Sequence, residues 1–161
     1  MSELHKIFDS YAMPLYRFLL KLSGSASMAE ELLQETFYQA ILHIGSFEGR
    51  SSVYTWLCRI GKNAWLKECH RASSTSIVPL EELTAADPGL GPEEALIRRE
   101  ELLAIRHAIA NLEEPYKEVF ILHVFGGVKL KQIAEEAGKS ESWARVTYHR
   151  AKSQIIKEVV K

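Results

Sequence analysis

The sequence of 161 residues contains little of what marks several protein classes. It has two cysteines, too few for the disulfide framework of a small secreted domain. Its 9 glycines and 5 prolines are far below the proportions of collagen-like or disordered chains. No hydrophobic run approaches the roughly 20 residues of a membrane-spanning helix. The first ten residues carry charges where a secretory signal has its apolar core. We therefore expect a cytoplasmic protein.

Neither sign of charge dominates, since 20 Lys and Arg face 21 Asp and Glu for a formal net charge of −1. The distribution is more informative than the total. Residues 1–71 carry a net charge of +1, residues 72–95 carry −5 with no Lys or Arg, and residues 96–161 carry +3. Two neutral to mildly basic blocks therefore flank an acidic segment.

Hydrophobic residues recur at helical spacing through the first block. Pro14 lies within the first such run, residues 4–22, and we expect a kink or a new segment there. A second run covers residues 29–44. Residues 45–52 have the composition of a loop, and a third helix is expected over about 53–70.

Residues 72–95 resemble a linker, because they are rich in Ser, Pro and Gly and show no sustained period. Fully stretched, 24 residues reach about 80 Å, far enough for two domains to bind well-separated sites. Beyond them the pattern is helical again, with Pro92 suited to a first turn, a second helix opened by Pro115, and two more expected at about 129–137 and 141–158. The expected fold is all-α: two small helical domains, residues 1–71 and 96–161, joined by a flexible acidic linker.

Residues 130–144 have the pattern of a helix-turn-helix. Ala134 supplies the small residue needed where two helices cross, and Gly138 tolerates the positive φ of the turn. Ser140 suits the N-cap of the second helix. The apolar residues expected to face the neighbouring helices are Ile133, Ala137, Ala144 and Tyr148. The basic second helix favours recognition of a DNA major groove, although a helical hairpin with a solvated basic face has the same pattern.

A second cationic stretch runs from Arg50 to Arg71, where five Lys and Arg face a single acid and three large aromatic residues interleave. Cations and aromatic platforms suit single-stranded nucleic acid. We expect Trp56 itself to be a core residue, since large aromatic residues at helical spacing are usually buried. Residues 29–40 by themselves form an ordinary amphipathic helix.

The cysteines and histidines match no catalytic or metal-binding pattern. Cys58 and Cys69 would lie about 16 Å apart on one helix, too far for a disulfide. Cys69 and His70 have no further ligands at the spacing of a zinc site. With no phosphate-binding glycine loop and no nucleophile motif, we expect neither an enzyme nor a cofactor.

Together, these segments resemble a bacterial RNA polymerase sigma factor of the extracytoplasmic-function (ECF, group IV) family. The resemblance covers nearly the whole chain. It is carried, in order, by Leu15–Leu20, Ala29–Phe37, Phe47–Ser52, Thr55–Asn63 and the helix-turn-helix that ends in His149-Arg150-Ala151. Their order and spacing match region 2 and region 4 of the family, and five such motifs in order are very specific.

The resemblance implies that the first domain binds core RNA polymerase and the −10 promoter element. Gln34 and Glu35 fall where region 2.2 contacts the β′ clamp helices, with Leu32, Leu33 and Phe37 fixing that helix. The −10 element would be captured as a flipped base by the loop and the helix that follows it: Phe47, Arg50, Ser51, Ser52, Lys62, Asn63 and Lys67.

The resemblance implies that the second domain meets the −35 element through Ser140, Arg145, Val146, His149, Arg150 and Lys152. The expected partners are core polymerase, through its β′ clamp helices and β flap, promoter DNA and an anti-sigma factor. The acidic linker would lie in the RNA-exit path of the polymerase, where a charge of −5 suits a basic channel. The chain departs from the family at Lys129, Lys139, Trp143 and Thr147, which leaves the −35 sequence open.

Other classes of protein explain less of the sequence. A stand-alone helix-turn-helix regulator accounts for residues 113–158 but not for the first block, and it should protect a palindrome without polymerase. A module that only mimics a sigma factor could keep the Gln34–Glu35 face but would not need a basic recognition helix.

Overall fold

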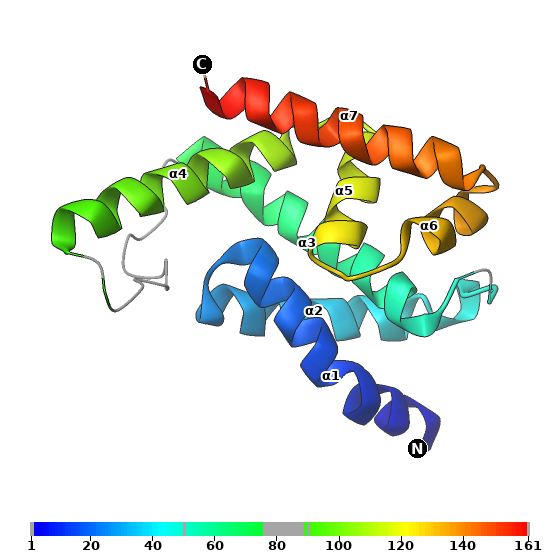
Figure 1. The fold of residues 1–161 in the computed structure, drawn as a ribbon. Coiled ribbons are helices and arrows are strands. Elements are labelled where there is room, and N and C mark those ends of the chain that lie inside the picture. Colours follow the sequence, from blue (N-terminus) through cyan, green and yellow to red (C-terminus); the bar gives the residue numbers. More distant parts are fainter. Residues whose placement is uncertain (1, 50, 76–88, 90, 161) are drawn as a thin grey trace.

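The computed structural model describes residues 2–49, 51–75, 89 and 91–160. Across these residues the regular structure is entirely helical, with seven α-helices and one short 3₁₀ helix and no strand (Figure 1). The predicted all-α fold is therefore confirmed for the described part of the chain. None of the helices described is long and apolar enough to cross a membrane.

The first domain comprises α1 (Ser2–Ser23), α2 (Ala26–Leu42), η1 (Ile44–Ser46) and α3 (Val53–Thr75). The three long helices pack on one another. Their shared core includes Leu15, Phe18, Leu19, Leu22, Leu32, Leu57 and Trp65.

Gly61 allows α3 to approach its neighbours closely. A Cβ atom there would lie 3.1 Å from Leu19 Cδ2 and 3.2 Å from Thr36 Oγ1. A glycine inside a helix costs about 1 kcal/mol relative to alanine. Here it permits the tight packing of α3 on α1 and α2.

Helix α1 continues through Pro14, so the predicted start of a new segment there is wrong. Pro14 lies on the exposed side of α1, whereas Leu15, Phe18 and Leu19 are buried. A proline removes the hydrogen bond to the carbonyl four residues earlier. At this position that carbonyl belongs to Ser10, another exposed residue, where water can satisfy it.

The second domain comprises α4 (Pro92–Ala110), α5 (Tyr116–Val124), α6 (Leu130–Ala137) and α7 (Glu141–Val160). Helices α4, α5 and α6 all pack against α7. The core includes Ile109, Leu112, Val119, Ile121, Leu122, Ile133, Ala144, Ala151 and Ile155. The helices begin and end close to the predicted positions, except that α3 extends to Thr75. The predicted linker, residues 72–95, falls largely on residues outside the described ranges.

The turn between α6 and α7 forms as the sequence predicts. Gly138 adopts a left-handed conformation with φ 69°, and the N–H of Lys139 closes the end of α6 by donating to the carbonyl of Ala134 at 2.9 Å. Ser140 Oγ accepts from the N–H of Trp143 at 3.1 Å and so caps α7. Ala137, the last residue of α6, is exposed, contrary to prediction.

The two domains touch in this structure. Helix α3 packs against α1 and α2 of its own domain and against α4 and α5 of the second, and in Figure 1 it lies between these two groups of helices. At one side of this contact, Arg106 Nε on α4 donates to the carbonyl of Leu22 at 3.0 Å, at the end of α1. Burial lowers the pKa of Arg106. Arg106 is therefore partly buried where α4 meets the end of α1.

Candidate nucleic-acid interface

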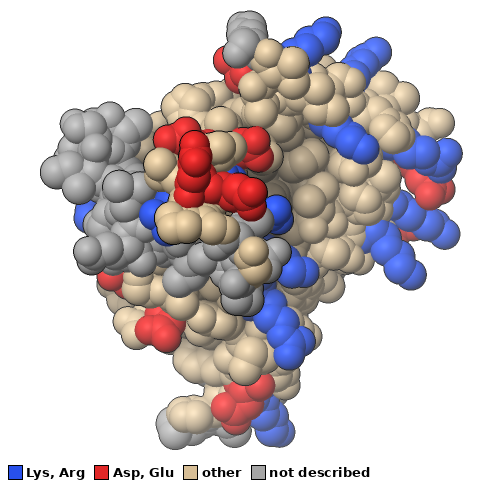
Figure 2. Space-filling view, turned by 60° about the vertical axis from the view of Figure 1, so that its left-hand side comes forward, with Lys and Arg blue, Asp and Glu red and all other residues tan. Residues whose placement is uncertain are grey.

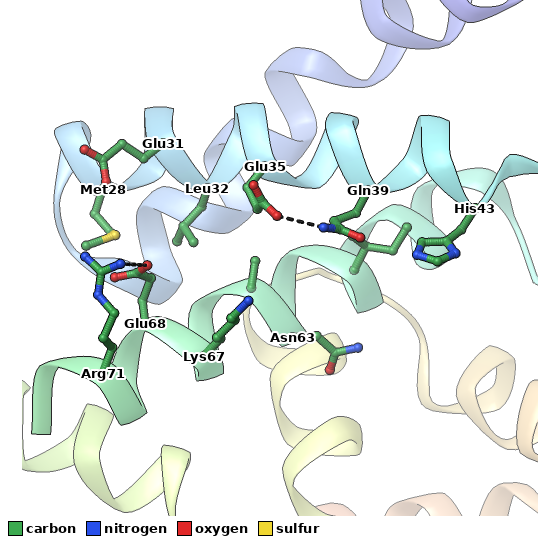
Figure 3. A pocket seen from close by; sticks show the side chains of 12 residues that line it. Met28, Glu31, Leu32, Glu35, Gln39, His43, Asn63, Lys67, Glu68 and Arg71 are labelled. Carbon is green, nitrogen blue, oxygen red and sulfur yellow. Dashed lines mark hydrogen bonds and ion pairs between the residues drawn. The ribbon is translucent and has the colours of Figure 1, made fainter. Parts of the chain in front are cut away.

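An open groove of about 640 Å³ lies between α2 and α3. Figure 3 shows Glu31, Glu35, Gln39 and His43 along its α2 side. The α3 side carries Asn63, Lys67, Glu68 and Arg71. The groove thus presents acidic and amide groups from α2 opposite cationic and amide groups from α3, which also contributes the carboxylate of Glu68.

The exposed residues of α2 are held in place by buried neighbours. Gln34 and Glu35 are exposed, and Glu35 Oε1 accepts from Gln39 Nε2 at 2.8 Å. Leu32 is buried at 2% exposure, and the ring of Phe37 packs 4.4 Å from that of Phe8. Leu32 and Phe37 therefore lie where they can orient the polar face rather than form its surface.

The loop before α3 places an aromatic pair beside a helix cap. The ring of Phe47 lies 5.0 Å from that of Trp56 at an interplanar angle of 45°. Trp56 is half-buried and packs against the core, so the prediction of a core residue holds in part, whereas Trp65, at 4% exposure, lies fully within the core. Ser52 Oγ accepts from the N–H of Thr55 at 3.1 Å, which fixes the start of α3. Ser51 is half-buried, and Arg50 lies outside the described residues.

The candidate residues for the −10 element divide between two sides of α3. Asn63 and Lys67 are exposed and line the groove with α2. Lys62 is only 5% exposed and faces the second domain, where Nζ lies 3.1 Å from Glu118 Oε1. The sequence placed these three residues on one surface, whereas the structure brings only Asn63 and Lys67 together.

The candidate residues for the −35 element share the outer side of α7. Arg145, Val146, His149, Arg150 and Lys152 are exposed. Val146, His149 and Arg150 line a shallow depression that continues along α7 to Lys157. Arg145 lies nearer the start of the helix, with Nη2 3.4 Å from Glu141 Oε1.

The opposite side of α7 anchors it in the domain. Ala144, Thr147, Ala151 and Ile155 are buried there. Tyr148 is half-buried, with its ring 5.9 Å from that of Phe120 and 4.9 Å from that of His123. The cationic side chains therefore project from a helix whose rotation is fixed by packing.

The acidic start of α4 lies apart from these cations. Glu93 and Glu94 occupy the first turn of α4. Figure 2 turns that end of the molecule forward and shows a group of acidic side chains there, while many Lys and Arg side chains lie toward the right-hand edge. In this view the acidic side chains are thus most numerous at that end of the molecule, although single acids also lie among the cations elsewhere.

The residues that join the two domains were not predicted from the sequence. Arg59 Nη2 donates to Glu136 Oε2 at 2.9 Å, between residues 77 positions apart. No local pattern reveals such a pair, since helical periodicity reports only contacts within one element. A cation on the apolar side of a helix was the only available signal.

Neither cysteine has the character of a reactive thiol. Burial raises the pKa of Cys58 to about 12 and that of Cys69 to about 11, so both thiols stay protonated at neutral pH. Among the residues described, no group of three or more His, Cys, Asp or Glu is placed to hold a metal ion.

Comparisons with known proteins match each domain separately. Residues 7–75 match the family described as Sigma-70 region 2, and residues 102–155 match that described as Sigma-70, region 4. The RNA polymerase sigma factor YlaC of Bacillus subtilis (strain 168) is 28% identical over 163 residues, covering 99% of this chain and 94% of its own. The ECF RNA polymerase sigma factor SigX of the same organism is 27% identical, covering 95% of this chain and 81% of its own.

A solved structure has a similar fold. It is the sigma factor RpoE in complex with the anti-sigma factor NepR from Bartonella quintana, with a TM-score of 0.57 at 21% identity. The match covers 99% of this chain and 98% of that one.

Proposed function

Because this chain belongs to the extracytoplasmic-function family of bacterial RNA polymerase sigma factors, we propose a role in transcription initiation for each of its exposed surfaces. Members of the family are transcription factors, and this chain is an alternative sigma factor that binds core RNA polymerase and promoter DNA. The observation that carries this conclusion is the occurrence of regions 2 and 4, in that order, on one chain. A stand-alone DNA-binding regulator would leave the first domain unexplained.

The polymerase-binding surface is the exposed face of α2. Gln34 and Glu35 contact the β′ clamp helices, while Leu32 and Phe37 hold α2 in position. Support comes from the exposure of the first two residues and the packing of the other two. The second domain meets the β flap of the same enzyme.

The −10 surface is built from the loop and α3. Phe47, Ser51 and Ser52 lie at the start of α3, and Asn63 and Lys67 lie along the groove. The exposed amide and ammonium groups can bind a base edge and a phosphate. Arg50 belongs to this proposal by its place in the sequence, and Lys62 joins it only when the second domain moves away.

The −35 surface is the outer side of α7. Arg145 and Val146 lie near the start of this helix, where recognition helices contact base edges. His149, Arg150 and Lys152 follow along the same helix, and Ser140 caps it. We propose residues 1–71 as the first domain, 72–95 as the linker and 96–161 as the second domain, with α3 running on to Thr75 and α4 starting at Pro92 inside the proposed linker.

The chain acts in the cytoplasm, where polymerase and chromosome meet, and it is held inactive by an anti-sigma factor. The similar structure, a sigma factor bound to its anti-sigma factor, supports the second part of this proposal.

Run-off transcription tests the proposed function directly. Purified chain and core polymerase are incubated with a library of promoter fragments. Transcripts that require the chain and share one −35 and one −10 sequence are expected. A tight and specific gel shift by the chain alone, without transcripts, would instead favour a stand-alone regulator.

A further inference from the structure

The outer side of α7, proposed to bind the −35 element, also carries an acid at its start. Glu141 is exposed and occupies the first turn of α7. Its Oε1 lies 3.4 Å from Nη2 of Arg145, and the side chains of Glu141 and Arg145 are 49% and 56% exposed. A carboxylate is repelled by the phosphates that neighbouring cations attract. An acid here therefore lowers the general attraction of α7 to DNA and can favour binding only through a partner side chain or a base edge.

The side chains of Glu141 and Arg145 leave α7 in similar directions. Ala144, Thr147 and Ala151 are buried and fix the rotation of the helix. Residues four positions apart differ by about 40° around a helix and by about 6 Å along it. Glu141 and Arg145 therefore lie together on one flank of the outer side.

The capped start of α7 holds Glu141 in place. Ser140 Oγ accepts from the N–H of Trp143 at 3.1 Å, and the carbonyl of Ser140 accepts from the N–H of Ala144 at 3.3 Å. The backbone of Glu141 lies inside this capped turn. Its carboxylate can thus restrain the long and flexible side chain of Arg145 one turn later.

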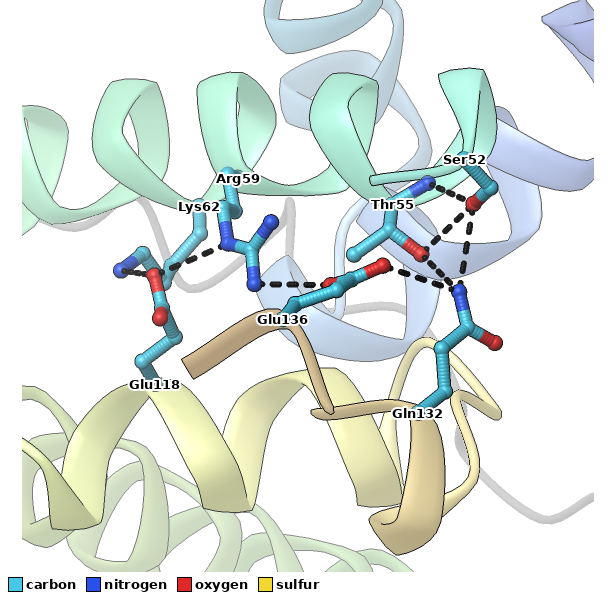
Figure 4. Close-up of polar contacts among 7 residues, drawn as sticks. All are labelled: Ser52, Thr55, Arg59, Lys62, Glu118, Gln132 and Glu136. Atoms are coloured by element: carbon cyan, nitrogen blue, oxygen red, sulfur yellow. Dashed lines mark hydrogen bonds and ion pairs between the residues drawn. The ribbon is translucent and has the colours of Figure 1, made fainter. Parts of the chain in front are cut away.

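This ion pair differs from those of α3, whose cations Arg59 and Lys62 meet carboxylates of α5 and α6 (Figure 4). Glu141 and Arg145 both belong to α7, so the pair moves with the helix as one unit. Entry of α7 into a groove therefore need not break it. Exposed pairs at this spacing contribute little to folding stability, so the effect of the pair falls on what α7 binds rather than on the fold.

Arg145 has enough donors for a carboxylate and a base at the same time. A guanidinium carries five N–H groups in a fixed plane. Bidentate bonds to O6 and N7 of guanine use two of them and leave others for Glu141. A side chain that is already held in place loses less conformational freedom on binding than a free one. Rotation of Arg145 toward a phosphate would instead break its pair with Glu141.

We propose that Glu141 is a positioning residue that holds Arg145 against a guanine of the −35 element. The pair stays together on the promoter, with the guanidinium between the carboxylate and the base edge. Glu141 thereby makes the second domain more selective for sequence and less attracted to DNA in general. This inference rests on the proposed function, because it requires that α7 reads the −35 element.

The test measures sequence preference with the full chain bound to core polymerase. Run-off transcription is compared among promoters that differ by single base pairs in the −35 element, for Glu141→Ala, Arg145→Ala and the double variant. Arg145→Ala should lose the preference for guanine at one position. Glu141→Ala should weaken the preference at that same position about fivefold, since Arg145 must then be ordered on binding. The double variant should show no greater loss than Arg145→Ala alone, because the two residues act as one unit.

Matched variants separate positioning from a loss of helix stability. Glu141→Gln keeps an oxygen that can accept from the guanidinium and should retain part of the preference. Glu94→Ala makes the same change in the first turn of α4, where no base contact is proposed, and should leave the preference unchanged. Chemical denaturation of each variant measures stability, a change in which would alter transcription from all promoters alike.

Three results overturn the positioning role: equal scaling of all promoters by Glu141→Ala, a loss at a position other than that of Arg145, or losses that add in the double variant. Uniform scaling by Arg145→Ala also overturns it, because no guanine contact is then left to position. Each of these results is read from promoters that the wild-type chain transcribes. Absence of transcripts from every promoter with the wild-type chain counts against the proposed function, and with it against this inference.

Discussion

Helices α3 and α7 both carry rows of Lys and Arg, yet they differ in what covers these side chains. On α7 the candidate DNA-binding residues Arg145 and Arg150 are exposed. On α3, Arg59 and Lys62 face carboxylates from another domain, whereas Asn63, Lys67 and Arg71 line an open groove. The composition of a helix therefore indicates which ligands it can bind, while its packing partners determine which of its side chains can reach them.

The largest expected effect is on polymerase binding by the face of α2 that the second domain leaves exposed. Glu35→Lys with Gln34→Ala should abolish capture of core polymerase in a pull-down, because like charges placed together in an interface cost several kcal/mol. Glu101→Lys on the exposed side of α4 makes the same change in net charge and should leave capture unchanged. Helical circular dichroism should be unaltered in both. Normal capture by the Glu35 variant would remove α2 from the polymerase-binding surface.

The next effect distinguishes two arginines on α7. Arg145 lies near the start of the helix and Arg150 lies further along it, beside the depression. Arg145→Ala should change the preference among −35 sequences by about 1–3 kcal/mol, the usual contribution of arginine to reading a guanine edge. Arg150→Ala should lower transcription more uniformly, as loss of a phosphate contact does. Transcription from a set of −35 variants provides the measurement, and uniform scaling by Arg145→Ala would make Arg145 a phosphate contact.

A smaller effect concerns thiols inside the first domain. Burial raises the pKa of Cys58 to about 12 and that of Cys69 to about 11 in the folded chain, against an ordinary value of 9.0. Above pH 9 the unfolded chain loses these protons first and binds fewer of them, so stability falls as pH rises. Between pH 9 and pH 10 the free energy of unfolding should fall by about 1–2 kcal/mol. Chemical denaturation at each pH measures this slope, which Cys58→Ala with Cys69→Ala should flatten.

The smallest effect concerns one hydrogen bond between the domains. Tyr54→Phe removes the bond from the hydroxyl to the carbonyl of Gly126, together with the contact of that hydroxyl with the Cys58 thiol, and should lower the free energy of unfolding by about 0.5–1 kcal/mol. Tyr38→Phe, at an exposed tyrosine of α2, is the matched control and should change it little. Equal losses in the two variants would show that the bond contributes nothing to stability.

Sequence reasoning succeeded where local chemistry decides the structure. Pro92 starts α4, Gly138 ends α6 in a left-handed conformation, and Ser140 caps α7, each for a reason contained within a few residues. The exposed face of α7 followed from the same helical spacing. Such features depend on neighbours along the chain, and these are visible in the sequence.

The errors arose where distant parts of the chain meet. Lys62 was grouped with Asn63 and Lys67, although its partner Glu118 lies 56 residues away. Trp56 was expected in the core and packs against its edge, half-buried, with the loop residue Phe47 as a partner. Ala137 was expected to be buried but is exposed at the end of α6. Periodicity cannot identify a partner from another element or the extent to which other elements cover the end of a helix.

Gly24 shows how a single methyl group would reach from one domain into the other. This glycine has φ 74° and follows the end of α1, and a Cβ atom there would overlap the guanidinium of Arg106. Any larger residue must therefore push this guanidinium aside, against its bond to the carbonyl of Leu22, and must also strain the backbone at a positive φ. Variation at residue 24 would thus weaken one contact between the domains while every proposed DNA-binding and polymerase-binding side chain stays the same.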